Sequence, residues 1–527
     1  MKRFLISLVV LLFFHLPSPA YDLQKGKSLL KGLKEAAALY ESGSATDADK
    51  ILNWVFEDQN TDPDSRNFGC WGWVKGGPNR DLNVPLFSTP SMFIDLWAQK
   101  EKMSAGTRDA YEKACERITT AVERRFKQEH FPVGRDRFDY TNAFCAYVES
   151  LTIIAYRTGD VRLKKKAVEQ WNRFYRHWMM HSFSEFMSSH YDDVDFNSIM
   201  NIRRYAADER IKAQAKELLD DLFIAEAAAS HPVLKENIVG SSRDYRERQK
   251  GGDCRAAFLV NPPADYEIPA KALELLNQKK YPFEFEGRAG ALTFTYKSYQ
   301  LEDAGLGTMT GWGNYFWQQL HLVAAAGRDE NHRATVFAPG VNNPINGFTD
   351  QKGMSALLVY NRAPSLWHLT SGKGADVKST LDPFGIGTSD GFTILKNDPG
   401  ELVLSAYGYD FHFWPFEVAG GRLRPCSLTS VHRGGTSASK RYHNRKADFT
   451  EYIFPEDNDW MGAVVKVVKS GTKLKAPRVS FTETDGVTVF EDSADGLLVK
   501  VGLTPQGASV AIPRNDLYTM PRRKMNQ

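Results

Sequence analysis

Cysteine is scarce in this chain, and the few that are present follow no spacing that would hold a fold together. The 527 residues include only five, none of them in a CxxC pair: Cys70, Cys115, Cys145, Cys254 and Cys426. A disulfide framework and a structural zinc site both need denser, regularly spaced cysteines. The sequence therefore argues against both and allows at most two disulfides.

The chain also lacks an excess of either charge. It carries 67 lysines and arginines against 64 aspartates and glutamates. A protein that binds nucleic acid needs a basic excess on at least one face, so this balance argues against a nucleic-acid partner. A local cationic groove can still exist on a neutral protein. An acidic sugar polymer therefore stays open as a partner.

Long apolar runs are missing except at the N-terminus. Lys2 and Arg3 precede the apolar run Phe4 to Leu16, and a small-residue cleavage site ends at Ala20. This is the layout of a cleavable signal peptide, and the run is too short for a stable membrane span. We expect residues 1–20 to be removed and the mature chain to be secreted or periplasmic, without membrane insertion.

The spacing of apolar residues divides the remaining chain into two halves. In residues 21–281 they recur at i, i+3/i+4 and i+7, for example in 25–42, 107–128, 141–160 and 161–180, which is typical of amphipathic helices. Paired helices joined by short turns predict an array of αα-hairpins, either a solenoid or a closed toroid. Because no fixed sequence repeat is visible, we favour an incomplete (α/α) toroid.

Residues 282–522 instead contain short alternating or β-branched runs separated by turn residues, and 523–527 form a tail. This pattern predicts an antiparallel β-sandwich of roughly twelve or more strands. One helix is expected within it, from Gly313 to Ala326. The glycine-containing stretch 385–391 lacks the strand–loop–helix context of a phosphate site, so a hairpin turn is expected there. The length of the chain also exceeds one ordinary core, which supports two domains.

Polar side chains gather in Ser184–Arg204, where His190 and Tyr191 precede a run of acids. A second polar segment, 240–248, carries Arg243 and Tyr245. Imidazole, phenol and guanidinium groups together suit the removal of a proton from a carbon beside a carboxylate. They match hydride transfer and phosphate chemistry poorly. No cofactor is expected for such a reaction.

A helical half followed by a strand half, behind a signal peptide, resembles the heparinase II/III-like and alginate-lyase group of polysaccharide lyases. The segments that carry the resemblance are short: 189–202 (SHYDDVDFNSIMNI), 239–246 (VGSSRDYR), 306–314 (LGTMTGWGN) and 346–354 (NGFTDQKGM). The resemblance implies a toroid followed by stacked antiparallel sheets. It also implies a secreted enzyme that cleaves a uronate polymer by β-elimination, taking the C5 proton and expelling the 4-linked sugar.

The same resemblance implies roles for single residues. A uronate lyase must neutralise the substrate carboxylate, supply a base and return a proton to the leaving oxygen. Tyr191 is the first candidate for base and acid, and His190 for a second base or a carboxylate partner. Arg243 and Tyr245 are candidates for contact with the substrate. Each has a structural alternative, since Tyr191 can belong to a helix cap and Arg243 to a salt-bridged turn.

Amide and aromatic side chains complete the expected site. Asn142 opens a long apolar helix and is a candidate for the carboxylate-binding amide, with an N-cap as its alternative role. Asn197 is the second candidate amide. Trp71 and Trp73 stand in a glycine-rich loop with Asn83 nearby, and their rings could form a platform for a sugar or pack in the core.

Two histidines of the strand half, His412 and His432, are weaker candidates. The resemblance implies a histidine that reaches the site from the sheets, but a single histidine on an alternating strand is more often structural. An Asp-rich segment could also suggest calcium. The glycine and the bidentate glutamate of an EF-hand loop are missing, however, so no metal is expected.

Two rival functions remain open on sequence grounds. A glycoside hydrolase on the same helical scaffold would use a pair of carboxylates, for which the candidates are Glu185, Asp192, Asp193 and Asp195. A non-catalytic glycan-binding protein would need none of these groups for chemistry. The clustering of Tyr191 with His190 favours the lyase.

Overall fold

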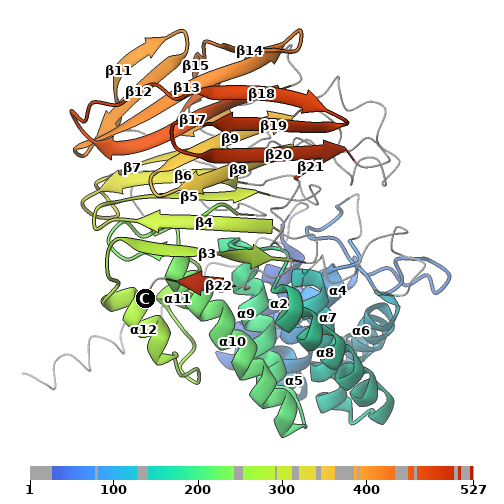
Figure 1. Cartoon of the computed structure of the whole chain (residues 1–527). Helices are drawn as coiled ribbons and strands as arrows, with labels where there is room; N and C mark the ends of the chain where they lie inside the picture. The colour runs from blue at the N-terminus through green and yellow to red at the C-terminus, as the bar shows by residue number, and fades with distance from the viewer. Residues whose placement is uncertain are drawn as a thin grey trace, which may run out of the picture. The chain divides into compact units, whose positions relative to one another are not determined.

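Helices precede the main sheets along the chain (Figure 1). The computed structural model describes residues 27–77, 81–126, 141–241, 253–290, 294–310, 320–339, 346–361, 385–389, 391–433, 449–455, 460–503, 509–511 and 523–525. The expected signal peptide lies outside these residues. None of the described helices is both long enough and apolar enough to cross a membrane. All five cysteines are buried, and none of them forms a disulfide.

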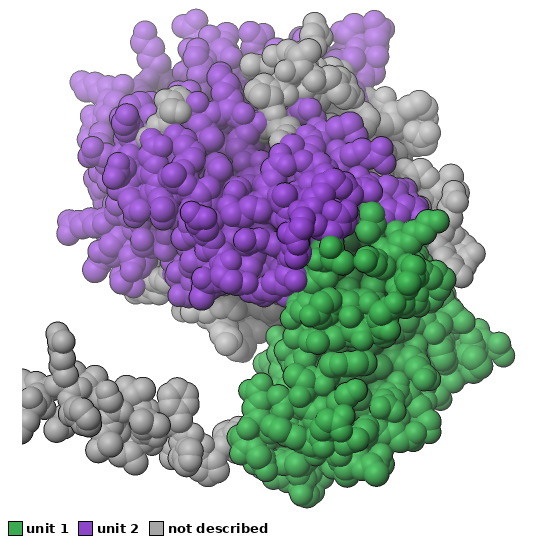
Figure 2. Space-filling model, turned by 90° about the horizontal axis from the view of Figure 1, so that it is seen from below, with its two compact units in different colours: residues 1–130, 146–168, 205–207 green, residues 131–145, 169–204, 208–527 purple. Residues whose placement is uncertain are grey.

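The chain forms two compact units, coloured separately in Figure 2. The first comprises Met1–His130, Ala146–Val168 and Tyr205–Ala207, and the second comprises Phe131–Cys145, Glu169–Arg204 and Asp208–Gln527. The second unit therefore combines helices with every described strand. The domain boundary expected at residues 281/282 marks the change from helices to strands, and as a boundary between domains it stays a prediction.

The expected amphipathic helices are confirmed in the described part of the first half. They are α2 (Leu29–Glu41), α3 (Ala45–Phe56), α4 (Val84–Pro90), α5 (Leu96–Gln99), α6 (Ala105–Arg124), α7 (Thr141–Thr158), α8 (Val161–His181), α9 (Ser189–Tyr205) and α10 (Glu209–Ala229). A π-helical turn (Ser91–Asp95) joins α4 to α5, and a 3₁₀ turn (Lys100–Lys102) follows α5. Ser28 caps α2 by accepting a hydrogen bond from the Lys31 N–H. Gly159, with a φ of 72°, ends α7 in the left-handed conformation that favours glycine.

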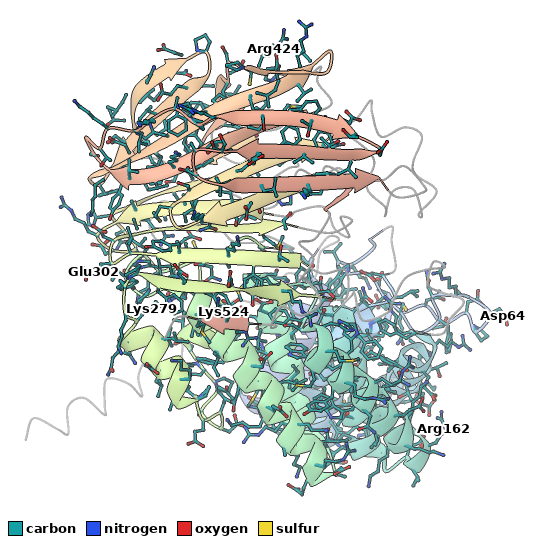
Figure 3. The ribbon with its side chains drawn as sticks, viewed as in Figure 1. Asp64, Arg162, Lys279, Glu302, Arg424 and Lys524 are labelled. Carbon is teal, nitrogen blue, oxygen red and sulfur yellow. The ribbon has the colours of Figure 1, made fainter. Side chains whose placement is uncertain are left out.

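The C-terminal end of α10 is tied to the sheets by a buried lysine. Lys279, labelled in Figure 3, follows α12 (Ala270–Asn277) and is 7% exposed. Its Nζ donates to the carbonyl oxygens of Ala227, Ala228 and Ser230 and to the side-chain oxygen of Gln300. The last carbonyls of a helix have no partner within it, so Lys279 satisfies those of Ala227 and Ala228, while burial lowers its pKa well below the ordinary value.

The described strands of the second unit form three large antiparallel sheets. The nine-stranded sheet has the order β15 (Thr429–Arg433), β16 (Phe449–Ile453), β10 (Gly385–Thr388), β7 (Arg333–Pro339), β6 (Leu320–Gly327), β5 (Ala304–Thr310), β4 (Phe294–Gln300), β3 (Phe283–Ala289) and β22 (Arg523–Met525). The seven-stranded sheet has the order β11 (Thr393–Asp398), β12 (Glu401–Ala406), β13 (Tyr409–Ala419), β17 (Trp460–Lys469), β9 (Ser355–Asn361) and β8 (Asn346–Lys352), with β14 (Arg422–Pro425) beside β13.

The third sheet has four strands: β18 (Val479–Thr484), β19 (Val487–Asp492), β20 (Leu497–Leu503) and β21 (Ser509–Ala511). A short two-stranded ladder, β1 (Ser230–His231) with β2 (Glu236–Asn237), and the short helix α11 (Ala257–Val260) connect α10 to α12. The helical half followed by antiparallel sheets agrees with the fold expected from the sequence at this level of detail.

The centre of the seven-stranded sheet is buried on both faces, although its edge strand β11 is exposed. On β9, Leu358 and Tyr360 belong to the core shared with the nine-stranded sheet, while Leu357 and Val359 pack toward the four-stranded sheet. Alternate side chains of a strand point to opposite faces, so a strand covered on both sides is apolar at nearly every position. The sheets are therefore stacked as layers with two apolar cores between them.

Two local predictions are wrong. The stretch expected to contain a helix over 313–326 instead contains β6, whose eight residues are all buried between β5 and β7. An unbroken apolar run suits a buried strand as well as a buried helix, and the pairing on both sides decides for the strand. The expected hairpin turn over 385–391 begins with β10, which pairs with β7 and β16.

Candidate functional site at the start of helix α9

The loop that leads into α9 is held firmly in the second unit. Phe183 stacks on Trp178 of α8 at 5.0 Å between ring centroids, and Phe186 stacks on Tyr296 of β4 at 4.3 Å. Residues 182–188 are all buried, although the backbone takes the left-handed conformation at the non-glycine residue Met187, with a φ of 53°. This packing fixes where the first turn of α9 begins.

His190 and Tyr191 lie together in that first turn. Ser188 caps the helix, because its hydroxyl accepts a hydrogen bond from the Tyr191 N–H at 3.4 Å. His190 is exposed and Tyr191 is partly exposed. Their rings meet edge to face with centroids 4.9 Å apart. The two groups expected to exchange protons with a substrate are therefore neighbours at an accessible helix start.

Buried carboxyl groups follow these two residues on α9 and lie on the neighbouring helix α10. Asp192 and Asp195 of α9 and Glu226 of α10 are all fully buried. Burial raises the pKa of Asp192 well above its ordinary range, and the nearby Glu226 carboxyl group raises it further. Two neighbouring carboxyl groups cannot both ionise without repulsion, so the protonated form of Asp192 is favoured. Burial, with the neighbouring charge of Glu185, also raises the pKa of Asp195. Both aspartates therefore favour the neutral form.

This arrangement predicts a pH-dependent stability that Asp192→Asn should remove. A carboxyl group whose pKa is raised on folding binds its proton more tightly in the folded state. Stability is therefore lost as pH rises from its ordinary pKa of 3.8. The asparagine amide keeps the shape and can donate to Glu226 without ionising. We expect the variant to unfold a few degrees above the wild type at pH 8 and close to it at pH 4, in thermal scans monitored by circular dichroism.

The matched control for this prediction is the exposed Asp64→Asn, which removes a surface carboxyl group and should leave the unfolding temperature within error at both pH values. An Asp192→Asn variant that unfolds below the wild type at pH 8 would contradict the raised pKa of Asp192, because the ionised carboxylate would then be the stabilising form.

The third aspartate of the segment has a separate structural role. Asp193 accepts hydrogen bonds from the N–H groups of Ala257 and Phe258 at 2.9 Å each and so fixes the start of α11. Burial raises its pKa to about 6, against the lowering effect of these two bonds. Asp192, Asp193 and Asp195 thus turn to different partners, and among the described residues no group of three potential ligands could hold a metal ion.

The chain reaches the second polar segment along the nine-stranded sheet. Ser241 forms a backbone bridge with Leu320 at the start of β6, and its hydroxyl donates to the Phe186 carbonyl in the loop before α9. Arg243 and Tyr245 follow two and four residues later, and they lie outside the described residues. The structure therefore connects the beginning of their segment to the same loop that positions Tyr191.

The two candidate amides have partners within the second unit. Asn142, at the start of α7, is buried, and both its backbone N–H, at 2.8 Å, and its side-chain amide donate to the Glu185 carboxylate. Asn197 lies on the exposed side of α9 and donates to the Asp193 carbonyl at 2.7 Å. Asn142 thus belongs to a buried polar group with Glu185, whereas Asn197 faces solvent.

Three candidate substrate-binding residues belong to the first unit. Trp71 is fully buried, so neither ring face is open to a sugar. Trp73 is 41% exposed, packs on Phe87 and donates its indole N–H to Asp81. Asn83 is buried, and its oxygen accepts two hydrogen bonds from Arg125. Of the three, Trp73 alone presents a surface that could stack on a pyranose ring.

The structure does not bring His412 and His432 to the start of α9. His412 points from β13 toward the four-stranded side of the seven-stranded sheet, since its neighbours Phe411 and Phe413 face the other core. Its ring stacks on Trp414 at 5.3 Å. His432 is exposed on β15, which is an edge strand of the nine-stranded sheet.

A different histidine of the sheets was missed. His321 of β6 is fully buried, and its Nδ1 lies 3.1 Å from the Met309 carbonyl, which can only accept and so fixes the proton on Nδ1. Burial lowers its pKa to about 4. The Nε2 acceptor has no partner among the described residues. The sequence pattern predicts a helix over 313–326 and so does not single out His321. The position of this ring depends on the strand that begins at Leu320, where Ser241 forms a bridge.

Comparisons with known proteins add only distant similarities. No family model matches the chain, and no curated protein matches it. It is similar to a chondroitinase AC lyase whose structures were determined with oligosaccharides, with 10% identity over 90% of this chain and 81% of that one, and a TM-score of 0.39. It is also similar to a sugar epimerase from a ruminal bacterium, with 13% identity over 40% of this chain and a TM-score of 0.29, and the match covers 63% of the epimerase.

Proposed function

We propose that this chain cleaves an acidic polysaccharide by β-elimination, with Tyr191 as the proton-transfer residue. The observation that carries the proposal is the accessible phenol beside His190 in the first turn of α9. The positive end of the helix dipole favours a phenolate at this position. The imidazole beside it can share the proton or contact the substrate carboxylate.

The buried acids support this role through their charge state. An ionised Asp192 or Asp195, within one helical turn of Tyr191 on α9, would repel a uronate carboxylate and disfavour the phenolate. Because burial keeps both aspartates in the neutral form, the site carries less negative charge than its sequence suggests. A segment rich in aspartate is thereby compatible with an anionic substrate.

In the proposed reaction the Tyr191 phenolate removes the proton from C5 of a uronate. The electron pair of the C5–H bond forms the C4–C5 double bond, and the bond from C4 to the glycosidic oxygen breaks. The phenol then returns a proton to the departing oxygen. The products are an unsaturated uronate and a free sugar hydroxyl, so protons and electrons balance without a cofactor.

The hydrolase alternative is less well supported. It needs two carboxyl groups that reach a glycosidic bond from opposite sides. Glu185, Asp192 and Asp195 are fully buried, and both oxygens of Asp193 are occupied by backbone N–H groups. No pair from this segment therefore faces solvent in the way that such a reaction requires.

The remaining parts of the proposal follow from the sequence. Arg243 and Tyr245 would contact the substrate carboxylate, with Asn142 in a supporting position. We further propose that the helices form an incomplete (α/α) toroid and the strands a β-sandwich. The chain would be exported after cleavage at Ala20, since an acidic polysaccharide is an extracellular substrate.

A screen of acidic polysaccharides tests the proposal. The wild-type protein is incubated with alginate, glucuronan, heparin-like and chondroitin-like chains, and product is followed by the ultraviolet absorbance of the unsaturated uronate. We expect one class to give an absorbing product. Depolymerisation without this absorbance would support the hydrolase. Binding to a polymer that stays intact would support a non-catalytic glycan-binding protein.

A further inference from the structure

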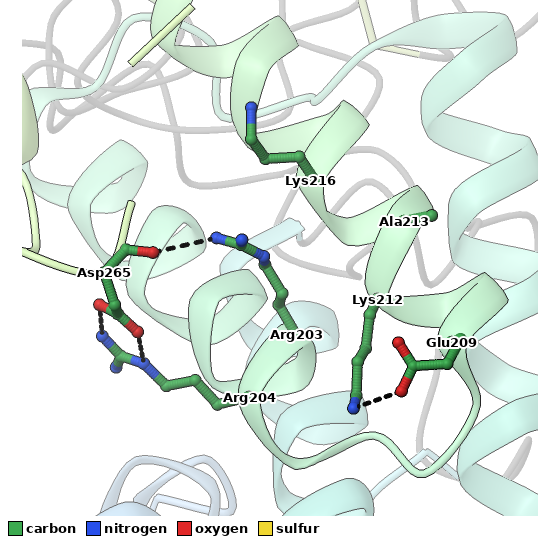
Figure 4. A pocket seen from close by; sticks show the side chains of 7 residues that line it. All are labelled: Arg203, Arg204, Glu209, Lys212, Ala213, Lys216 and Asp265. Carbon is green, nitrogen blue, oxygen red and sulfur yellow. Dashed lines mark hydrogen bonds and ion pairs between the residues drawn. The ribbon is translucent and has the colours of Figure 1, made fainter. Parts of the chain in front are cut away.

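A cationic pocket lies at the other end of α9 from Tyr191 (Figure 4). Its volume is about 540 Å³, which falls within the range of small-molecule sites. It is lined by the last turn of α9, the first turns of α10 and the loop before α12: Arg203, Arg204, Glu209, Lys212, Ala213, Lys216 and Asp265. Tyr191 and Arg203 are twelve residues apart on one helix, which separates them by about 18 Å along its axis.

The acids at this pocket are already paired. Arg204 holds the Asp265 carboxylate with two hydrogen bonds, at 2.7 and 2.5 Å. Lys212 pairs with Glu209 at 2.7 Å, and Lys216 contacts both oxygens of Asp220, at 2.7 and 2.6 Å. Four cationic side chains line the pocket against two acidic ones, so the lining carries a positive excess.

The positive charge of the pocket lining that has no acidic partner among the described residues is that of Arg203. Its guanidinium group donates to the Asp265 backbone carbonyl at 3.3 Å and has no ion pair with any described residue. Figure 4 shows its side chain extending between α10 and Asp265. A guanidinium group has five N–H donors in a planar fork, so most of them are available to a ligand. A carboxylate or sulfate group matches this fork with two parallel hydrogen bonds.

We infer that this pocket is a second, non-catalytic binding site for an acidic sugar, whose carboxylate or sulfate group pairs with Arg203. The choice of a saccharide rests on the proposed function, whereas the choice of an anion rests on the pocket alone. Its volume exceeds what a single inorganic ion would fill. The site would hold a part of the polymer remote from the bond being broken.

The test is a ligand-observed NMR titration with glucuronate, a sulfated monosaccharide, neutral glucose and inorganic sulfate. We expect Arg203→Gln to weaken binding of at least one acidic sugar tenfold or more, with a smaller loss for Lys212→Gln. The matched control is Arg210→Gln, which removes one arginine charge from the first turn of α10, next to Glu209, but does not line the pocket. Comparing the affinities for glucuronate and for the sulfated monosaccharide identifies the ligand group as a carboxylate or a sulfate ester.

Three results would overturn the inference. Neutral glucose could bind as well as the acidic sugars, or inorganic sulfate could bind as tightly, which would indicate an adventitious ion only. Arg210→Gln could cause the same loss, which would indicate general surface charge. The polysaccharide screen separates the two proposals. If no polymer yields unsaturated product while Arg203-dependent binding persists, the proposed function is wrong and the inferred binding site is supported. If the protein is an active lyase and Arg203→Gln binds acidic sugars as the wild type does, only the inferred binding site is wrong.

Discussion

Replacing Tyr191 with phenylalanine is expected to lower kcat by on the order of 10²- to 10⁴-fold on the polymer that gives the unsaturated product. The upper part of this range applies if one phenol both removes the C5 proton and protonates the leaving oxygen. The ring itself is retained, so its edge-to-face contact with His190 and the packing of the first helical turn are preserved. Binding of the polymer, measured by titration with the inactive variant, should change little.

The control for this experiment is Tyr407→Phe. Tyr407 is 37% exposed in the turn between β12 and β13, on the seven-stranded sheet, and its hydroxyl has no assigned role. Its loss should leave kcat and KM unchanged. Retained turnover in Tyr191→Phe would contradict the assignment of Tyr191 as the base. If His190→Gln abolished turnover at the same time, the imidazole would replace the phenol in that role.

The pH profile separates catalysis from structure. An ionised phenolate is required for the first step, so the kcat of the wild type should rise with pH until Tyr191 is deprotonated. A variant that merely disturbs the helix start would lower activity at every pH without changing the profile. A substitution at Asp192 affects stability as described above, which makes Asp192→Asn a useful comparison for this purpose.

The helices could be predicted because each buries one stripe of apolar residues. Their spacing in 107–128 and 161–180 predicts α6 and α8 closely. Strands buried on both faces give a weaker signal. β6 is apolar at nearly every position and matches helical spacing by chance. It is a strand because it pairs with β5 and β7, and the local sequence pattern of β6 does not show this pairing.

The candidate site could be predicted in part. The adjacency of His190 and Tyr191 is a matter of sequence, and a cap residue before an apolar pattern marks the helix start. The raised pKa of Asp192 could not be foreseen, because its main cause is burial and because the nearby Glu226 carboxyl group comes from a different helix. His321 was missed for the same kind of reason, since its tautomer depends on the carbonyl of a neighbouring strand.

The glycines of β5 allow the segment that leads to Ser241 to lie against the nine-stranded sheet. The strand reads AGLGTMT, a poor strand sequence by propensity. A Cβ atom at Gly307 would lie 2.3 Å from the Ile238 carbonyl oxygen and 2.6 Å from the Val239 Cα. The segment that leads to Ser241 therefore lies directly on the strand, and only glycine permits that approach.

Gly307→Ala is accordingly expected to destabilise the protein by about 1–3 kcal/mol or more, because backbone rather than a flexible side chain must move. The same displacement would shift Ser241, whose hydroxyl contacts the Phe186 carbonyl before α9, and with it the start of the segment that carries Arg243. We therefore expect a lower unfolding temperature together with reduced kcat, measured by thermal unfolding and by the absorbance assay.

Two further glycines allow the expected losses of stability to be ranked. A Cβ at Gly305 would meet the Ile238 side chain, with its Cγ2 at 2.7 Å, so Gly305→Ala should cost less than Gly307→Ala. Gly106, in the first turn of α6, has no atom within 4 Å of an added Cβ, so Gly106→Ala should be neutral or slightly stabilising. The order of loss should be Gly307, then Gly305, then Gly106. Equal stability of all three variants would mean that the 238–241 segment does not rest on β5, and the link between the sheet and the start of α9 would fail with it.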